Sequence, residues 1–243
     1  MGQQASSPWV KRRRQATLQE IRTTARRLLR QHGPGGVTVN AVAREMGMSG
    51  PAVYRYYASH DALVEAVITD FYEELTTTML AARDAGPPEH PGRRLLSTCR
   101  AMRTWAIDHP SEFGWMFASP ALSAAKQDEE SPRLRAGQQF EKVFLDQFVD
   151  LWERAPYPVP DFEDLPPSIQ RQMTDYSART NSPLPPEALH LFLSSWIKLY
   201  GLLCMEILHQ LDFAYSDLEP VFEENLQELC AMHDLTYEPP SAE

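Results

Sequence analysis

The chain has 243 residues, 43% hydrophobic and 23% charged, enough for the core of one large domain or of two unequal ones. Its three cysteines, Cys99, Cys204 and Cys230, are odd in number and share no metal-ligand spacing, which argues against a disulfide framework and favours a reducing cytoplasm. No apolar run reaches membrane length, so we expect a soluble, cytoplasmic protein with no membrane partner.

The net charge of −10 is unevenly distributed. Residues 1–60 hold ten Lys or Arg and two acids, which gives +8, and residues 61–243 carry −18. A cationic module joined to an acidic body is typical of a protein that approaches phosphate with one end. A run of charged residues is, by itself, as often a solvated surface as a phosphate-binding one.

The first predicted elements are three short helices. Apolar residues at helical spacing predict an amphipathic helix over 17–31, which the Gly- and Pro-rich segment 32–36 ends. Thr38 is the predicted N-cap of a second helix, and Gly47 supplies the left-handed residue that lets the chain leave it. A third helix follows from Ser49. Three helices with a tight Gly-containing turn before the last form the helix-turn-helix plan.

The third helix is predicted to read DNA and to end near Tyr57. A helix fits the major groove, and small residues at its start allow close approach. Val53 and Tyr57 are predicted to point inward, as are Val42 and Ala43. Arg55 is expected to contact phosphate rather than a base. The predicted DNA-binding residues are Thr38, Arg44, Ser49, Gly50, Pro51, Ala52, Tyr54, Arg55, Tyr56 and His60.

Further basic residues precede and flank this motif. Residues 1–14 are predicted to form a flexible basic arm, which either reaches the minor groove or is an untethered solubilising tail. Arg22, Arg26 and Arg30 share the polar face of the first helix. We expect basic residues of this helix and of the arm to hold phosphate.

The rest of the chain is predicted to be helical, with proline-bearing breaks. A fourth helix, capped by Ser59, is expected over about 61–80. It links the helix-turn-helix domain, called the reader below, to a larger domain. The later predicted helices cover 95–107, 112–117, 134–152, 170–179, 187–211 and 217–233, the last capped by Ser216. This predicts an all-α protein with an N-terminal helix-turn-helix domain (15–62), a larger ligand-binding and dimerisation domain (63–235) and a C-terminal tail (236–243).

Aromatic and Met residues in the larger domain are candidates for an apolar ligand cavity, although such stripes are more often ordinary core. The candidate ligand-binding residues are Trp105, Phe113, Met116, Phe117, Phe144, Phe148, Trp152, Trp196 and Tyr200. The seven histidines show no paired ligand pattern, and Asp128-Glu129-Glu130 fits an exposed loop. We expect neither a metal nor a cofactor.

Three stretches carry a family resemblance: 37–43 (VTVNAVA), 48–57 (MSGPAVYRYY) and 59–63 (SHDAL). Together they resemble the TetR family of transcriptional regulators. Tyr57 stands where that family usually has Phe, and His60 where it usually has Lys. Downstream, His109 to Phe113 and Trp196 to Gly201 resemble the subgroup named for a Trp-His-Gly signature, with Tyr200 in place of the His.

The resemblance implies a homodimer, formed through the last two predicted helices (187–211 and 217–233) in a four-helix bundle. It also implies a repressor that binds a double-stranded DNA operator and is released by a small, largely apolar effector. Two rival functions remain. One is a non-specific, architectural DNA-binding protein. The other is an enzyme fused to a DNA anchor, for which the sequence shows no nucleophile with its base, metal cluster or phosphate-cradling loop.

Overall fold

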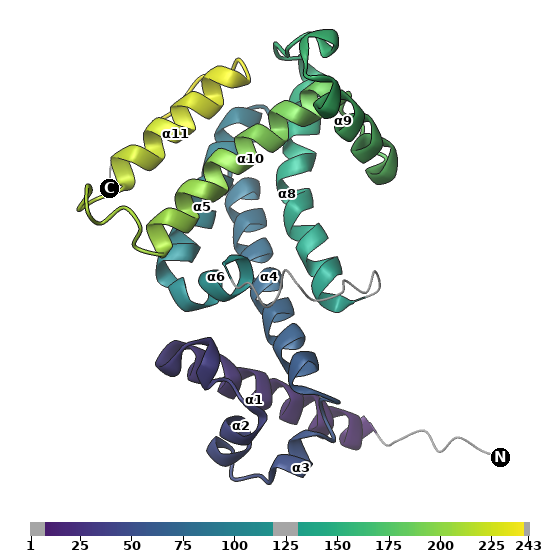
Figure 1. Ribbon diagram of the computed structural model, residues 1–243, viewed down its shortest axis with the longest axis vertical. Coiled ribbons are helices and arrows are strands. Elements are labelled where there is room, and N and C mark those ends of the chain that lie inside the picture. The colour runs from purple at the N-terminus through teal and green to yellow at the C-terminus, as the bar shows by residue number, and fades with distance from the viewer. Residues whose placement is uncertain (1–7, 119–130, 241–243) are drawn as a thin grey trace, which may run out of the picture. The chain divides into compact units, whose positions relative to one another are not determined.

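The computed structural model describes residues 8–118 and 131–240, and every regular element in those ranges is helical (Figure 1). This confirms the all-α class. The chain divides into two compact units: an N-terminal unit of Met1–Glu73 and Ser111–Gly137, and a C-terminal unit of Glu74–Pro110 and Gln138–Glu243. The predicted boundary after residue 62 stays a prediction; by contacts, the first part of α4 and the segment around α6 group with the N-terminal unit.

The N-terminal unit begins with α1 (Pro8–His32), a 25-residue helix. Its buried face includes Ile21, Leu28 and Leu29, at the helical spacing that predicted it. The helix starts at Pro8, so the prediction of a flexible arm is wrong for residues 8–14. Residues 1–7 of the predicted arm lie outside the described residues. A short 3-10 turn, η1 (Pro34–Gly36), follows α1.

Helices α2 (Val39–Glu45) and α3 (Gly50–Val53) complete the reader. Thr38 Oγ1 accepts a hydrogen bond from the Ala41 amide at 3.1 Å, which confirms the predicted cap. Gly47 has a φ of 64°, the left-handed conformation that ends α2. Helix α3 is shorter than predicted, since 54–56 form a turn, and Ser49 at its N-cap position makes no side-chain capping bond.

Helices α2 and α3 approach each other closely at Gly50. A Cβ atom added there would lie 2.8 Å from Oδ1 of Asn40. Real Cβ atoms do not come that close, so a larger residue would push the amide or the start of α3 aside. Because the close atom is the end of an exposed side chain, rotation of the Asn40 amide would relieve this contact at low cost.

The later helices keep the predicted order with longer or shifted ends. Ser59 Oγ caps α4 by accepting from the Ala62 amide at 3.0 Å. Ser216 does not cap α11, because Oδ1 of Asp217 accepts from the Glu219 amide instead. The bounds are α4 His60–Ala85, α5 Pro91–Asp108, α6 Pro110–Phe117, α8 Pro132–Arg154, η2 Phe162–Asp164, α9 Pro167–Thr180, α10 Pro186–Ile207 and α11 Glu219–Met232.

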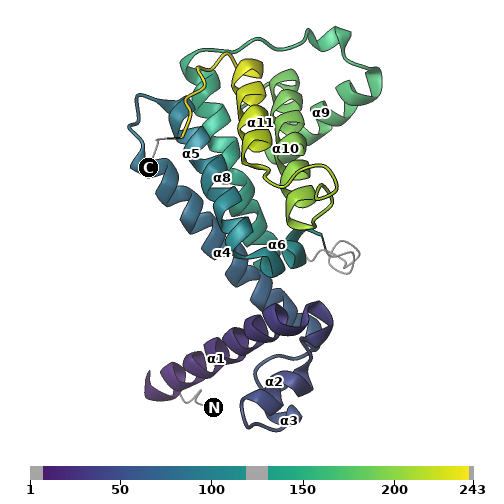
Figure 2. The ribbon, with the colours of Figure 1, turned by 90° about the vertical axis from the view of Figure 1, so that its left-hand side faces the viewer.

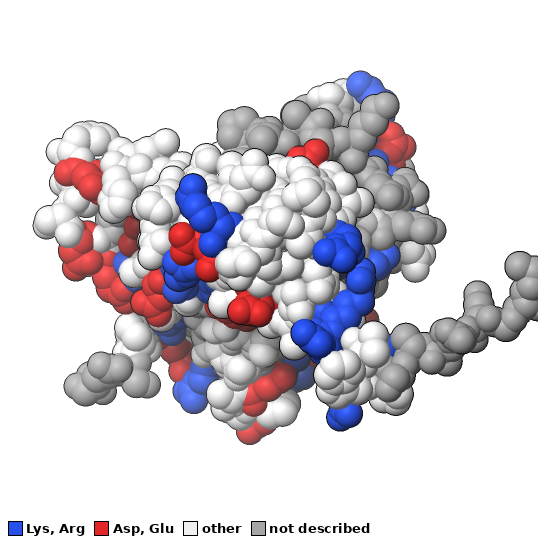
Figure 3. Space-filling view, turned by 90° about the horizontal axis from the view of Figure 1, so that it is seen from below, with Lys and Arg blue, Asp and Glu red and all other residues white. Residues whose placement is uncertain are grey.

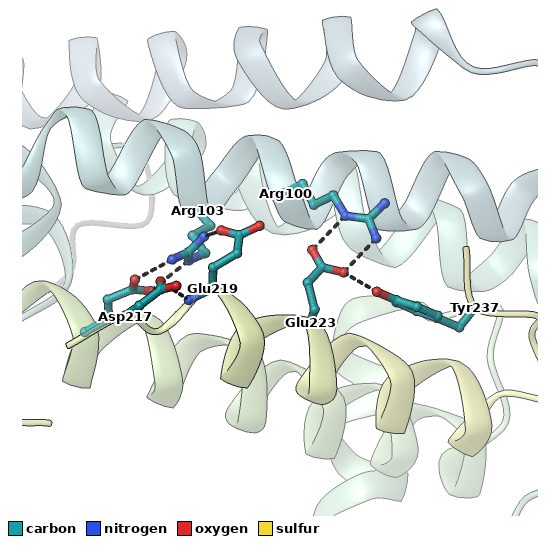
Figure 4. A network of polar contacts seen from close by, with 7 residues as sticks. Arg100, Arg103, Asp217, Glu219, Glu223 and Tyr237 are labelled. Carbon is teal, nitrogen blue, oxygen red and sulfur yellow. Dashed lines mark hydrogen bonds and ion pairs between the residues drawn. The ribbon is translucent and has the colours of Figure 1, made fainter. Parts of the chain in front are cut away.

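In the C-terminal unit α10 packs against α5, α9 and α11, and Figure 2 shows α10 and α11 side by side. A polar network joins α5 to α11 (Figure 4). Arg100 donates to both carboxylate oxygens of Glu223, at 2.9 and 2.7 Å, and Tyr237 donates to the same carboxylate at 2.7 Å. One turn along α5, Arg103 donates to Glu219. These charge-assisted bonds fix α11 along α5.

Candidate functional site

The predicted DNA-binding residues lie on the outside of the reader. Tyr54 is 51% exposed, and Val53 and Tyr57 are buried, as the sequence predicts. Gly50, Ala52 and Tyr56 are partly exposed. The exposed members of the predicted set are Thr38, Arg44, Ser49, Pro51, Tyr54, Arg55 and His60. The small residues of α3 therefore leave its backbone open to a large partner.

The N-terminal turns of α1 contact the end of the reading element. Arg14 donates through Nη2 to the Arg55 carbonyl at 3.3 Å, and its guanidinium lies 5.2 Å from the centre of the Tyr56 ring. That distance is within the range of a cation–π contact. Residues 12–14 therefore lie on a helix, beside the turn that follows α3. Neither of the two predicted roles, a minor-groove arm or an untethered solubilising tail, anticipated this placement.

Three arginines expected to hold phosphate are engaged inside the N-terminal unit. Arg22 pairs with Asp70 at 2.6 Å and donates to the Tyr57 hydroxyl at 3.2 Å. Arg26 and Arg30 both donate to Oε1 of Glu112 on α6, whose side chain is 1% exposed. Carboxylates therefore offset these charges. These pairs argue against a phosphate-binding role for this face of α1.

Among the described residues, other cationic side chains of the reader have no carboxylate partner and can contact an external anion. In the part of the chain that the structure describes, Lys11, Arg12, Arg44 and Arg55 form no ion pair with a carboxylate. Figure 3 shows one group of Lys and Arg side chains on the right of the view, while those on the left lie among Asp and Glu. Unpaired cations beside an exposed helix start suit a polyanionic partner.

His60 has a structural contact that the sequence did not suggest. Its Nε2 donates to the Val37 carbonyl at 2.7 Å, which ties the start of α4 to the residue before the α2 cap. Only Nδ1 of this ring is then free for a phosphate, and it lies 3.5 Å from Asp61.

The nine candidate ligand-binding residues do not form one set. Phe113, Met116 and Phe117 belong to the N-terminal unit, where Phe117 packs edge-on against Tyr72 with ring centroids 5.6 Å apart. The other six belong to the C-terminal unit. Among these, Trp105 stacks on His109 at 4.7 Å and donates to Glu74 at 3.0 Å.

Three candidates, Phe144, Phe148 and Trp196, surround a void in the C-terminal unit. The volume of this void is about 10 Å³, which leaves room for about one water molecule. The predicted aromatic cavity is thus closed in this structure. The sequence did not single out the rest of the lining, which is Cys99, Phe192, Ser195, Leu199 and Leu229.

A second pocket, of about 320 Å³, lies between the end of α5 and the α10–α11 connection. Arg103 and Glu206 line it and are paired with each other at 2.7 Å. Sequence patterns did not indicate this pocket, because its walls come from positions about 100 residues apart.

His233 is a buried histidine beside the closed void. It is 1% exposed, its Nε2 lies 2.9 Å from Ser195 Oγ, and its ring packs edge-on against Phe148 and Tyr157. Burial lowers the pKa of His233 to about 4. Desolvation disfavours the imidazolium, so the ring is neutral at pH 7.

This histidine predicts an acid-sensitive fold. In the unfolded chain the ring has the ordinary histidine pKa of 6.5, so below that pH the unfolded state binds more protons than the folded state. Stability should therefore fall as the pH drops from 6.5 toward 4. At pH 5 the loss from this residue is about 2 kcal/mol relative to pH 7. Urea titrations of wild type and His233→Phe at both pH values measure it, and equal pH dependence of the two proteins would contradict the expectation.

Comparison with known proteins covers both units. Residues 21–67 match the family of bacterial regulatory proteins described as tetR, and residues 95–229 match the tetracyclin repressor-like C-terminal domain. The HTH-type transcriptional regulators Rv1816 of Mycobacterium tuberculosis and Mb1846 of Mycobacterium bovis are each 36% identical over 95 residues, 39% of this chain. The match spans 41% of the length of these curated relatives.

Solved structures extend the likeness to the whole fold. The regulatory protein SCO4313 is 25% identical with a TM-score of 0.71, over 91% of this chain and 98% of that one. RolR in complex with resorcinol is 12% identical with a TM-score of 0.56, over 94% of this chain and 97% of that one. With one family description matching the reader and a second matching more than half of the chain, this protein belongs to the TetR family of transcriptional regulators.

Proposed function

We propose that the protein is a sequence-specific DNA-binding transcriptional regulator, acting as a repressor that a small, largely apolar ligand releases. The observation that carries the proposal is the exposed α3 edge, with Tyr54 and Arg55 outward and Val53 buried behind them. Unpaired cations on α1 and α2 flank this edge. The family to which the chain belongs supports the same reading.

Selection of bound fragments from a random duplex pool tests this function. At moderate salt and without effector, the protein should enrich one roughly palindromic site over scrambled DNA by a factor of about 10³ or more. The rival non-specific protein would show a steep salt dependence and no enriched site. Equal binding to every duplex would remove the regulator assignment.

We propose a homodimer formed through α10 and α11. By length and composition, helix α10 is apolar enough to cross a membrane, although no run of that length was expected from the sequence. Only 33% of its most apolar stretch is buried in the protomer. Ile197 on α10 is 67% exposed, and Leu208, the residue that follows the end of α10, is 43% exposed. A second copy would cover this apolar surface, as in isologous dimers, without any membrane.

Replacing Ile197 by Glu should weaken the dimer at least tenfold, because each interface would bury two unpaired carboxylates. Sedimentation equilibrium over a concentration series measures the dissociation constant. Glu at the 88%-exposed Phe213, in the connection after α10, is the matched control and should leave the dimer intact. A dimer unchanged by Ile197→Glu would place the interface elsewhere.

The ordered basic turns of α1 are proposed to contact phosphate. The double change Arg12→Ala and Arg13→Ala should then reduce the slope of log affinity against log salt by about 1.8, because each phosphate contact contributes about 0.9. Affinity for operator and for scrambled DNA should fall together. An unchanged slope would show that these side chains stay in solvent.

The effector is proposed to be a small aromatic or otherwise apolar molecule bound in the C-terminal unit. Phe144, Phe148 and Trp196 are the candidates that the structure brings together, around the closed void. RolR, which shares the fold, was solved with resorcinol, a small aromatic ligand. We further propose that the protein works in the cytoplasm, on DNA, without a cofactor and without enzymatic activity.

A further inference from the structure

The closed void in the C-terminal unit has a polar group on one side. Ser195 lines the void, and its hydroxyl lies 2.9 Å from Nε2 of His233 and 3.1 Å from the Leu191 carbonyl. A serine hydroxyl has one proton to donate, and in a helix it commonly goes to the carbonyl four residues earlier. His233 then donates through Nε2. Its Nδ1 is left as a bare acceptor.

Two polar atoms behind the void lining, on residues that do not belong to it, are buried without a hydrogen-bond partner among the residues that the structure describes. They are Nδ1 of His233 and the hydroxyl of Tyr157, whose side chains are 1% and 4% exposed. The two rings are in contact, with centroids 4.6 Å apart, and Phe148 of the void lining packs 4.7 Å from the His233 ring. Buried polar groups in native proteins normally have hydrogen-bond partners, because a buried donor or acceptor without one costs free energy.

We propose that the void opens to admit a neutral hydroxylated aromatic molecule, whose hydroxyl donates to Nδ1 of His233 and accepts from the hydroxyl of Tyr157. The inference rests on the proposed function, because it names the chemical class of the effector. It adds two polar recognition residues that the sequence did not indicate.

The chemistry of the walls selects this class. Phe144, Phe148 and Phe192 present aromatic surfaces, which suit a ring. None of the lining residues carries a formal charge, so a phenolate or an ammonium would lose its hydration without a counter-ion. An unprotonated Nδ1 requires a donor, which a hydroxyl supplies and a methyl ether does not.

Trp196 is the side chain that must move for the ligand to enter. It is the partly exposed member of the lining, whereas the other seven residues are buried. Its ring is held by contacts with Phe140, Phe144 and Tyr200, at centroid distances of 5.6, 5.3 and 5.6 Å. Rotation of this one ring would enlarge the void without breaking a backbone bond.

The test compares phenol with anisole, which has the same ring and a blocked donor, by calorimetry on the full chain. Wild type should bind phenol at least ten times more tightly than anisole. Tyr157→Phe and His233→Phe should each bring that ratio close to one while anisole still binds. Tyr176→Phe is the matched control, because the Tyr176 hydroxyl already donates to Glu141 at 2.9 Å and is not an unpartnered group, so this variant should keep the wild-type ratio.

Thermal unfolding of the unliganded proteins gives a second readout. Tyr157→Phe removes a hydroxyl that has no partner, so its Tm should equal or exceed that of wild type. A lower Tm would show that the hydroxyl is bonded within the fold, and would overturn the proposal. Equal affinity for phenol and anisole in wild type, or no binding of either at millimolar concentration, would do the same.

The experiment separates this inference from the regulator assignment. Operator binding is measured on the same samples before ligand is added. If the protein binds its operator but does not prefer phenol, only the proposed effector class is wrong. If it prefers phenol but selects no operator, the ligand site is supported and the proposed regulatory function is wrong.

Discussion

Glu112→Ala is expected to lower the free energy of unfolding by about 3 kcal/mol, since removing one partner of a buried ion pair leaves the other charges uncompensated. Glu112 accepts hydrogen bonds from both Arg26 and Arg30, with Nε–Oε1 distances of 2.7 and 2.5 Å. The expected loss lies at the low end for buried pairs because the arginine side chains are 24% and 48% exposed and can regain water.

Urea denaturation at fixed protein concentration measures this change. Glu45→Ala is the matched control: Glu45 of α2 pairs at 2.8 Å with Arg27, which lies on α1 like Arg26 and Arg30, but this pair is exposed and its loss should cost much less stability than the loss of Glu112. Similar losses for the two variants would show that burial of Glu112 adds nothing. Glu112→Gln keeps the shape of the side chain and should fall between the control and Glu112→Ala.

The Glu112 contact matters for function because it joins α6 to the first helix of the reader inside one compact unit. Arg26 also lies over the Phe71 ring, at 5.2 Å from its centroid, so one guanidinium contacts both α4 and α6. Any shift of α6 would have to break these contacts or carry α1 with it. The Glu112→Ala variant should therefore also loosen the placement of the reader.

The helices themselves were predictable because their signals are local. The Thr38 and Ser59 caps and the left-handed Gly47 depend on residues within four positions of each, and all three are confirmed. Helix ends were less predictable: the last helix was predicted to begin at Asp217 with Ser216 as its cap, but α11 begins at Glu219, whose amide donates to Asp217. The division inside α4 depends on packing between distant segments, which no local pattern reports.

The same distinction explains the site. Exposure on α3 follows from helical periodicity, so its outward residues were found correctly as a group. Whether an arginine is free depends on a carboxylate elsewhere, and Glu112 lies more than 80 residues from its partners on α1. His233, Ser195 and Tyr157 come from three separate segments. Nothing in their spacing suggests that they meet.

Tyr54→Ala is expected to weaken operator binding by about 30-fold, or about 2 kcal/mol, the cost of one good contact at a DNA interface. The side chain is 51% exposed and follows the last turn of α3, so its loss should change the free energy of unfolding by less than about 0.5 kcal/mol. Fluorescence anisotropy at one fixed salt concentration measures the affinity, because affinities at different salt are not comparable.

The matched control for Tyr54 is Tyr215→Ala. Tyr215 is 46% exposed, close to Tyr54, but belongs to the C-terminal unit, so its removal should leave operator affinity unchanged. If Tyr54→Ala instead lowered the Tm while each folded molecule still bound the operator normally, Tyr54 would be a packing residue. Because Val53 and Tyr57 already fill the buried side of this segment, the outward side chain has DNA as its expected partner.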